Sequence, residues 1–465
     1  MRRVVIGAAI VLCLALLSWG RAARRSPVPG LLIDGRRVDI ILVTIDALRA
    51  DHLGVYGYDR PTSPNLDRLA VDAAVVRNHI SQAPFTKASI ASLFTGLFPT
   101  SHKAFTTSRS FSETMTGHVT GSLPVTDVLD STLWRLPSAL AAAGYETAGV
   151  NANPFLLDEF GFAKGFDHYE FVTKGPNLAS AEQVIGRALA RIDGRDARKP
   201  LFLWLHLMEP HSPYMPAPEY RSMFPPRTPP RPAPADAIPP WIAENGSTDA
   251  NVYEALYDAE IREADTALGR FFDALKSRNL WSSLVLVVTA DHGEEFFDHG
   301  GFEHNKTLYD EMLRVPLFVR APGLRGGMRE IQTQAVDLAP TLATIAGVPV
   351  PDYLAGADVW KDLHQRGGGA PLAYAERSGQ LFAIRTREWK FISDLIAHHE
   401  LYNLAVDPGE IHDLAPTNPD RTREMRNRLT AVVGVAVRTG QRVQGQYAPI
   451  PPRVLRRLKS LGYVQ

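Results

Sequence analysis

Residues 38–70 read VDIILVTIDALRADHLGVYGYDRPTSPNLDRLA, and this stretch carries the pattern that decides the fold. Residues 38–45 are mostly aliphatic without polar alternation, which is typical of a central parallel strand covered by helices on both faces. Asp46 follows this strand directly. A buried carboxylate needs a positive partner, and ligands bind at the carboxyl ends of the strands in such sheets.

A second segment of the same kind, residues 282–301 (SSLVLVVTADHGEEFFDHGG), places Asp291 and His292 after an apolar run. Two buried strands could therefore bring Asp46, Asp291 and His292 to one edge. Carboxylate and imidazole donors without a thiolate suit one divalent ion, Ca, Mg, Mn or Zn. Taken singly, Asp46 could cap a helix and Asp291 could open a turn. Their joint occurrence with His292 favours a metal site.

Five blocks of sequence carry a family resemblance. They are IDALRADHLGVYGY (45–58), APFTKASIASLFTGLFPTSH (83–102), FLWLHLMEPHSPY (202–214), TADHGEEFFDHGGFEHNKTLYDEMLRVPLFVRAPG (289–323) and ELYNLAVDPGEIHDL (400–414). In this order they resemble the sulfatase branch of the alkaline phosphatase superfamily. The resemblance implies an α/β, alkaline-phosphatase-like sandwich with a mostly parallel central sheet flanked by helices. It also implies a small C-terminal α+β subdomain with antiparallel strands.

The chain length and the alternation of strand and helix patterns agree with this layout. A chain of 465 residues exceeds the usual limit for a single core. We expect a sulfatase-like catalytic domain over residues 31–365, with a Pro-rich surface excursion over 213–241. A C-terminal subdomain is expected over 366–465, after the Gly-rich run RGGGAP.

Individual elements can be predicted from apolar spacing. The expected helices are 65–72, 89–97, 133–143 and 421–437, and the expected strands include 144–150, 201–208 and 315–322.

The charge balance and the amino-terminal segment indicate which partners and which location to expect for the protein. The 50 basic residues equal the 50 acidic residues, so the chain lacks the charge excess of a nucleic-acid binder. Residues 1–30 begin MRR, continue with the apolar stretch 4–19 and end in a basic run, which indicates a signal peptide or a membrane anchor. We therefore expect an extracytoplasmic protein, periplasmic, secreted or membrane-anchored. The single cysteine, Cys13, lies in this segment.

Thr86 is the candidate nucleophile. On local pattern alone it could be an ordinary cap of the following helix. In the family, however, the nucleophile lies ten residues before the glycine that Gly96 matches, and that place is Thr86. Sulfatases have Cys or Ser there, followed by x-Pro-Ser/Ala-Arg, and convert it to formylglycine. Residues 86–90 read TKASI, so the convertible residue, the proline and the arginine are all absent.

Threonine at this place resembles the phosphotransferases and nucleotide pyrophosphatases of the superfamily, whose alkoxide attacks phosphorus. Their metal ligands would correspond to Asp46, Thr86, Asp291 and His292. A hydroxyl pKa near that of water, about 16, must fall by roughly 8 units, or about 11 kcal/mol, for ionisation at neutral pH. A helix terminus supplies at most about 2 kcal/mol, so a metal ion must supply most of the activation.

The remaining candidate catalytic residues come from the resemblance. His211 would face the transferred group, with Glu209 orienting it. His304 and Lys306 occupy the substrate-binding region, so Lys306 would neutralise charge and either histidine would be the general acid. His206 lies inside a strand and is more typical of a core histidine. Lys87 could replace part of the missing arginine.

Three functions are compatible with these residues. The first is an exported metal-dependent hydrolase of sulfate or phosphate esters that acts through a covalent intermediate on Thr86, with phosphate or phosphonate chemistry favoured. The second is a phosphotransferase that moves a phospho-group to a lipid or glycan acceptor. The third is a catalytically inactive binding protein. In each case the partner is an anionic ester, possible membrane attachment runs through residues 4–19, and no nucleic acid is expected.

Overall fold

The structure is a computed structural model that describes residues 30–105, 125–174, 177–234, 237–240, 242–365 and 367–460. The signal or anchor expected at residues 4–19 lies outside the described residues. Within them, no helix combines the length and the apolar character that a membrane span requires.

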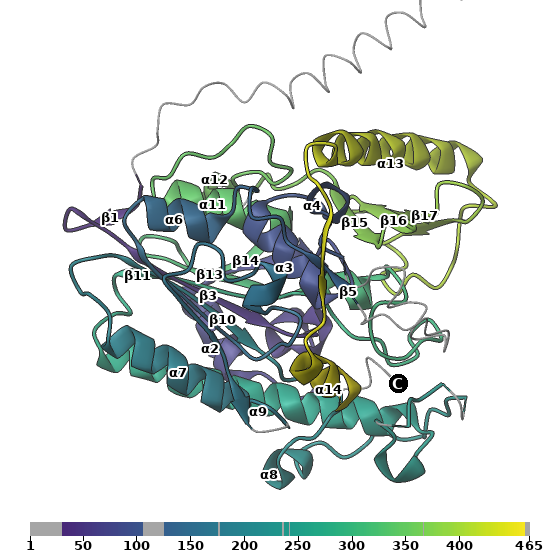
Figure 1. The fold of residues 1–465 in the computed structure, drawn as a ribbon. Coiled ribbons are helices and arrows are strands. Elements are labelled where there is room, and N and C mark those ends of the chain that lie inside the picture. The colour runs from purple at the N-terminus through teal and green to yellow at the C-terminus, as the bar shows by residue number, and fades with distance from the viewer. Residues whose placement is uncertain are drawn as a thin grey trace, which may run out of the picture.

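A nine-stranded sheet forms the centre of the molecule (Figure 1). Eight strands follow one path, β12 (Arg314–Val315), β4 (Ala74–Ile80), β13 (Leu317–Arg320), β11 (Leu284–Ala290), β3 (Asp39–Ile45), β10 (Leu201–Leu207), β6 (Glu146–Asn151) and β7 (His168–Phe171), and β14 (Gly327–Gln334) pairs with β4. The run from β11 through β3, β10 and β6 to β7 is parallel throughout. The predicted mostly parallel sheet is thus confirmed.

Helices cover both faces of this sheet because its central strands are apolar on both sides. On one face lie α2 (Pro64–Asp72), α7 (Ala181–Asp193) and α9 (Ala250–Ser277); on the other lie α3 (Thr86–Thr95), α6 (Leu136–Ala142) and α11 (Leu338–Ile345). Successive residues of β3 alternate between the two cores: Ile41 and Val43 pack with α9, while Ile40 and Leu42 pack with α3 and α11. This alternation explains the aliphatic run without polar positions.

The sequence located most elements, with shifts at their ends. Helix α3 begins at Thr86, three residues before the predicted start, and this difference places Thr86 in the first helical turn. The strand predicted over 315–322 is divided into β12 and β13 by Pro316, which has no N–H to continue the ladder. Within the described part of residues 213–241, the regular structure is the short helix α8 (Pro218–Arg221).

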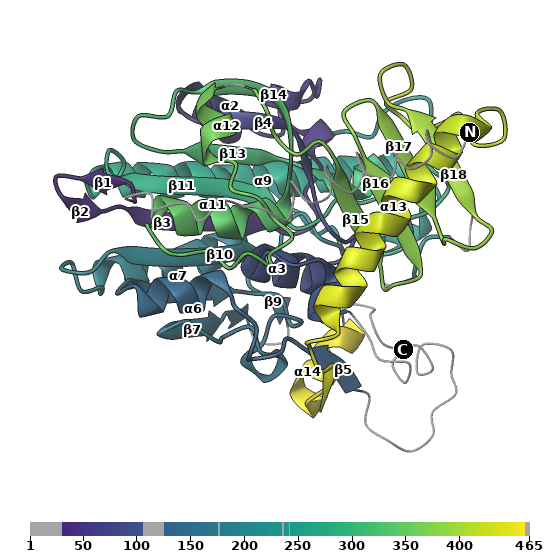
Figure 2. The same cartoon turned by 90° about the horizontal axis from the view of Figure 1, so that it is seen from above.

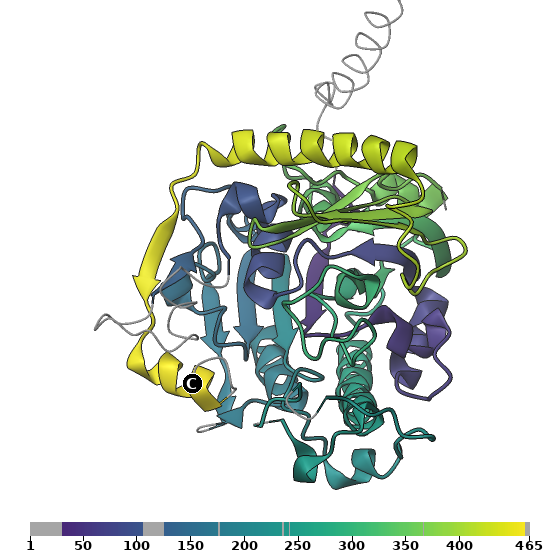
Figure 3. The ribbon, with the colours of Figure 1, turned by 90° about the vertical axis from the view of Figure 1, so that its right-hand side faces the viewer.

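The C-terminal part contains a four-stranded antiparallel sheet, as predicted for this class of fold. Its strands are β15 (Ala373–Arg377), β16 (Leu381–Arg385), β17 (Trp389–Ser393) and β18 (His399–Asn403). Helix α13 (Pro419–Gly440) packs across β16 and β17 (Figure 2). The chain then returns to a segment far earlier in the sequence, where β19 (Gln446–Pro449) pairs with β5 (Val125–Val128) and α14 (Pro452–Ser460) follows (Figure 3).

Candidate functional site

The carboxyl ends of four neighbouring parallel strands form the candidate site. Asp46 follows β3, Asp291 follows β11, Asn153 follows β6, and His211 follows β10. Because these strands run in the same direction, the residues after them share one edge of the sheet. Thr86 reaches the same place from the first turn of α3, where unpaired amides favour negative charge.

The four residues expected to bind metal lie together and are buried. Thr86 Oγ1 is 3.4 Å from Asp46 Oδ1 and 3.3 Å from His292 Nε2. His292 Nε2 is 3.4 Å from Asp46 Oδ1 and 3.6 Å from Asp291 Oδ2. These separations exceed those of good hydrogen bonds. Each of the four side chains therefore lies within 3.6 Å of at least one other, without a short hydrogen bond between them.

Two further features of this group fit a cation. Asp291 Oδ2 is buried and has no hydrogen-bond partner among the residues that the structure describes. His292 Nδ1 lies 2.8 Å from the carbonyl oxygen of Gly293, a contact in which the Nδ1–H donates, so the lone pair of Nε2 faces the two carboxylates. A buried carboxylate oxygen left unpaired beside an imidazole lone pair is the arrangement that a divalent ion would complete.

The pKa shifts of the two carboxylates also fit a bound cation. Burial opposes the ionisation of Asp46, but nearby imidazoles, with His211 contributing most, hold the pKa of Asp46 below its usual value. Burial and the negative charge of Asp46 raise the pKa of Asp291. Two adjacent buried carboxylates do not ionise together easily without a cation between them.

Sequence reasoning missed two residues that contact Asp46. His206, taken as a core histidine, is fully buried in β10, yet its Nε2 lies 3.1 Å from Asp46 Oδ2. Asp46, His206 and Asp291 also form a group whose ligand atoms all lie within 4.8 Å of one another. Asn153 Nδ2 donates to Asp46 Oδ2 at 2.7 Å and lies 3.4 Å from Thr86 Oγ1. Its place just after β6 was the available signal.

A row of imidazoles stands beside the cluster. The ring of His304 lies 4.6 Å from that of His292 and 4.9 Å from that of His211, measured between centroids. Glu294, a third residue that sequence reasoning missed, is buried, and its Oε1 lies 3.1 Å from His304 Nδ1. Burial raises the pKa of Glu294 to about 7. Its position two residues after His292 was the signal for it.

Three residues do not make the contacts that the sequence suggested: Lys306, Lys87 and Glu209. Lys306 is exposed, and its ammonium donates to the carbonyl oxygen of Phe302 at 2.5 Å; among the described residues it makes no contact with the cluster. Lys87 points away from Thr86, because its Nζ donates to Thr126 Oγ1 at 2.7 Å. It therefore does not replace the missing arginine.

Glu209 also departs from its expected role of orienting His211. Its carboxylate accepts from the backbone N–H of Ala181 at 2.9 Å, at the first residue of α7. The carboxylate therefore serves to cap that helix.

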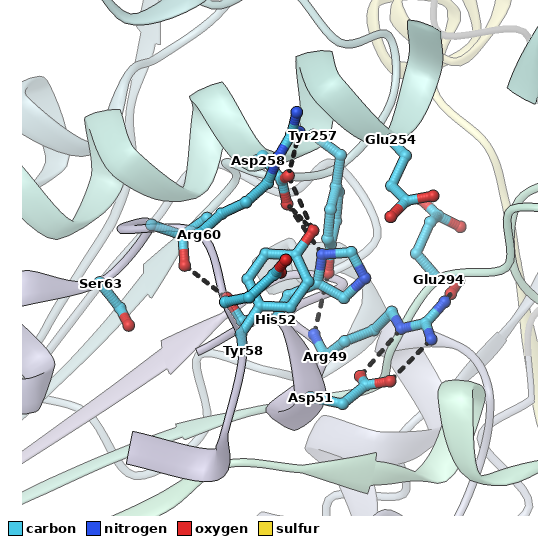
Figure 4. A network of polar contacts seen from close by, with 12 residues as sticks. Arg49, Asp51, His52, Tyr58, Arg60, Ser63, Glu254, Tyr257, Asp258 and Glu294 are labelled. Atoms are coloured by element: carbon cyan, nitrogen blue, oxygen red, sulfur yellow. Dashed lines mark hydrogen bonds and ion pairs between the residues drawn. The ribbon is translucent and has the colours of Figure 1, made fainter. Parts of the chain in front are cut away.

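A buried network holds the turn that carries Asp46 (Figure 4). The hydroxyl of Tyr257, from α9, donates to the carbonyl oxygen of Ala47 at 2.7 Å and accepts from the N–H of Arg49 at 2.9 Å. Ala47 has a φ of 56°, a conformation that costs energy for a residue with a side chain. The tyrosine thus holds both ends of a strained turn directly after Asp46.

Arg49 joins this turn to the loop that follows His292. It donates to the carbonyl oxygen of Glu294 at 3.1 Å and forms ion pairs with Asp51 at 2.8 Å and Asp298 at 3.0 Å. Its role in the structure is therefore to connect the two loops that present the acidic residues.

A second buried cluster packs against the first in Figure 4. Asp258 of α9 contacts His52 Nδ1 at 2.9 Å and accepts from the hydroxyl of Tyr58 and from Arg60, each at 2.8 Å. It anchors the segment after β3 to the longest helix.

The fold and the clustered carboxylates, imidazoles and hydroxyl define an ester hydrolase of the alkaline-phosphatase-like class. The chain belongs to the sulfatase family, since the family model described as Sulfatase matches residues 39–348. A second model, described as N-sulphoglucosamine sulphohydrolase, C-terminal, matches residues 297–433.

Individual relatives agree with this assignment. An arylsulfatase of Clostridium perfringens is 24% identical over 470 residues, covering 84% of this chain and 92% of the relative. A solved structure of a protein in complex with its substrate D-glucosamine-2-N,6-O-disulfate has a TM-score of 0.71 and 20% identity, covering 90% of this chain and 100% of that one. A phosphonate monoester hydrolase of Agrobacterium radiobacter has a TM-score of 0.68 and 21% identity, covering 87% and 96%. The two structures share the fold of this chain.

Proposed function

We propose that this sulfatase-family enzyme is an extracytoplasmic, metal-dependent hydrolase that acts through a covalent intermediate on Thr86, with phosphate or phosphonate esters favoured over sulfate esters. The observation that carries the proposal is the position of Thr86 Oγ1, 3.3 to 3.5 Å from an imidazole nitrogen and both oxygens of a carboxylate. A residue that served only as a helix cap would have no reason to face this set of donors. The absence of the formylglycine precursor favours direct attack by the hydroxyl.

One divalent ion, Ca, Mg, Mn or Zn, would be held by Asp46, Thr86, Asp291 and His292. When bound, such an ion lowers the pKa of a hydroxyl and offsets negative charge on the substrate. His206 and Asn153 would hold Asp46 in place through its other oxygen, as second partners of ligands do in metal sites.

The reaction is a double displacement. Thr86 Oγ attacks phosphorus, a Thr86–O–P bond forms, and the bond from phosphorus to the ester oxygen breaks. The departing oxygen takes a proton from a histidine. Water then attacks phosphorus and gives a proton back to the same histidine, the Thr86–O–P bond breaks, and Thr86 takes back from solvent the hydroxyl proton that it released on attack, so that protons and bonds balance.

We assign the general acid to His211. Burial lowers the pKa of His211, but the charges of Asp46 and Glu294 outweigh burial and raise it, which favours the protonated form. Burial, together with the positive charges of its neighbours, holds the pKa of His304 well below its usual value. His304 would therefore be neutral and would pack between His211 and His292. The exposed Lys306 would attract the anionic substrate to the site.

The decisive experiment compares wild type, Thr86→Ala and Thr86→Ser. Each is tested on aryl sulfate, phosphate monoester, phosphate diester, phosphonate and sulfated amino-sugar substrates, together with metal analysis of the purified protein. We expect Thr86→Ala to lose turnover and to keep its fold, and Thr86→Ser to retain part of the turnover. Phosphothreonine at Thr86, detected by intact mass after rapid quenching, would support the intermediate. Near-normal turnover in Thr86→Ala, or activity confined to sulfate esters, would refute the proposal.

Substrates with different leaving groups distinguish the roles of His211 and His304. Loss of a general acid should slow substrates with alkoxide leaving groups far more than substrates with nitrophenolate leaving groups, because nitrophenolate departs without a proton. We expect this pattern in His211→Ala and a similar loss on both substrates in His304→Ala. The opposite result would transfer the acid role to His304.

A further inference from the structure

A cavity of about 550 Å³ lies apart from the Thr86 cluster. It is bounded by β4 and β12 at the edge of the central sheet, by the short helix α10 (Asp310–Leu313), by the turn between β16 and β17, and by the loop after β18. None of Asp46, Thr86, Asp291 or His292 lines it. It is therefore a separate space between the large domain and the C-terminal sheet.

The carboxylates that line this cavity already have cationic partners. They are Asp51 and Asp298, both paired with Arg49, Asp310, paired with Arg385 and Lys390, and Glu311, paired with His299. Burial opposes the protonation of His299, but the hydrogen bond that its Nδ1–H donates to Glu311 outweighs burial and raises the pKa of His299 to about 9. Each of these four carboxylates thus has a cationic partner, with Arg49 shared by Asp51 and Asp298 and Lys390 shared by Asp310 and Glu410.

Two guanidinium groups in the same wall are left over. Arg314 in β12 and Arg387 in the turn between β16 and β17 form no side-chain hydrogen bond or ion pair with any residue that the structure describes. Arg314 acts on Asp51 and Asp310 only through space. Arginine presents several N–H donors in a plane that matches an oxyanion, and two such groups in one cavity form a receptor for negative charge.

The size of the cavity and its apolar lining residues indicate a ligand larger than an inorganic ion. Cavities of 300 to about 1,000 Å³ hold small molecules, and one oxyanion would fill a small part of this one. Phe297, Leu404 and Ile411 supply apolar surface. We propose that the cavity binds a small organic anion, whose phosphate, sulfate or carboxylate group meets Arg314 and Arg387 and whose body lies against the apolar wall.

The test measures binding in a Thr86→Ala background, so that no probe is turned over and the result does not depend on the catalytic assignment. The probes are glucose 6-phosphate, glucose 6-sulfate, glucuronate and inorganic phosphate, titrated by calorimetry at constant ionic strength. Arg314→Gln and Arg387→Gln remove one guanidinium each. Arg36→Gln is the matched control, because Arg36 lies exposed in the short strand β2 (Arg36–Arg37), outside the cavity.

We expect an organic anion to bind with about tenfold or more lower affinity in each cavity variant, and with unchanged affinity in the control. In thermal unfolding, the anion should raise the Tm of the Thr86→Ala protein and of the Arg36→Gln control, and this increase should be lost in the two cavity variants. Equal affinity in all three variants would place the binding elsewhere and overturn the proposal. Binding of inorganic phosphate as tight as that of the sugar anions would overturn its organic part, and no binding of any probe would overturn all of it.

Discussion

Replacing Tyr257 with Phe tests whether the strained turn after Asp46 is held from α9. The change removes one oxygen and leaves the buried ring in place. That oxygen makes two buried hydrogen bonds, to the carbonyl oxygen of Ala47 and from the N–H of Arg49. Each bond contributes about 1 kcal/mol net, and each backbone group left unpaired adds a desolvation cost of about 1 kcal/mol or more. The free energy of unfolding should therefore fall by about 2 to 4 kcal/mol.

Metal affinity distinguishes Tyr257 from a buried tyrosine that only stabilises the fold. Because Ala47 directly follows Asp46, relaxation of its positive φ would displace the carboxylate, and metal affinity should fall about tenfold or more. Tyr253→Phe is the matched control, since Tyr253 lies one turn earlier on α9 and its hydroxyl donates to the carbonyl oxygen of Ser247 at 2.7 Å, away from the cluster. It should lose stability without losing metal affinity.

The assays are urea unfolding and calorimetric titration with Mn²⁺ and Zn²⁺ after dialysis against a chelator. Stability lowered in both variants, with metal affinity lowered only in Tyr257→Phe, is the expected outcome. The reasoning fails if Tyr257→Phe binds metal like wild type, or if both variants lose affinity equally.

Three further predictions concern pH, metal and a neighbour of the cluster. Burial raises the pKa of Glu376, which accepts from the N–H of Thr100 at 2.6 Å, to about 7. As the pH rises, Glu376 ionises in the unfolded chain before it ionises in the folded protein, so its contribution should lower the free energy of unfolding by up to about 3 kcal/mol between about pH 5 and pH 8. In urea unfolding measured across this range, Glu376→Gln should show a weaker dependence of the unfolding free energy on pH. Parallel pH profiles for wild type and variant would contradict this. Asn153→Ala, which removes a donor to Asp46 Oδ2, should weaken calorimetric metal binding about 10 to 100-fold, and unchanged affinity would show that the contact is dispensable. Removing metal with EDTA should lower Tm and added divalent ion should restore it, whereas a Tm indifferent to both would argue against a bound cation.

Much of the fold could be read from the sequence because its signals are local. The aliphatic runs at 38–45 and 282–290 predicted buried parallel strands, and both became central strands with helices on each face. Element ends were less accurate, since they depend on single residues such as Pro316, which divides one predicted strand into two.

The candidate site could be predicted only in part from the sequence. Residues 46, 86, 291 and 292 could be chosen because each follows a strand or opens a helix in a matching block, and the structure brings each of them within 3.6 Å of at least one other. His206 was predicted to be a core histidine, and it is buried with both ring nitrogens in contact with partners, Thr44 and Asp46. An apolar strand pattern could not reveal that one of these partners is the candidate ligand Asp46. Lys306 and Lys87 were expected near the substrate, yet long flexible side chains can point to partners that no sequence pattern reveals.

By itself, the sequence determined the class of sheet, the family resemblance and the chemical types at the ends of its strands, because alternation and strand-end position are properties of neighbouring residues. Only the tertiary structure decided which oxygen of Asp46 meets which partner, that Asn153 and Glu294 join the cluster, and that Tyr257 supports the turn. These contacts join segments more than 100 residues apart in most cases, and their geometry depends on how packed layers set distances to within an ångström.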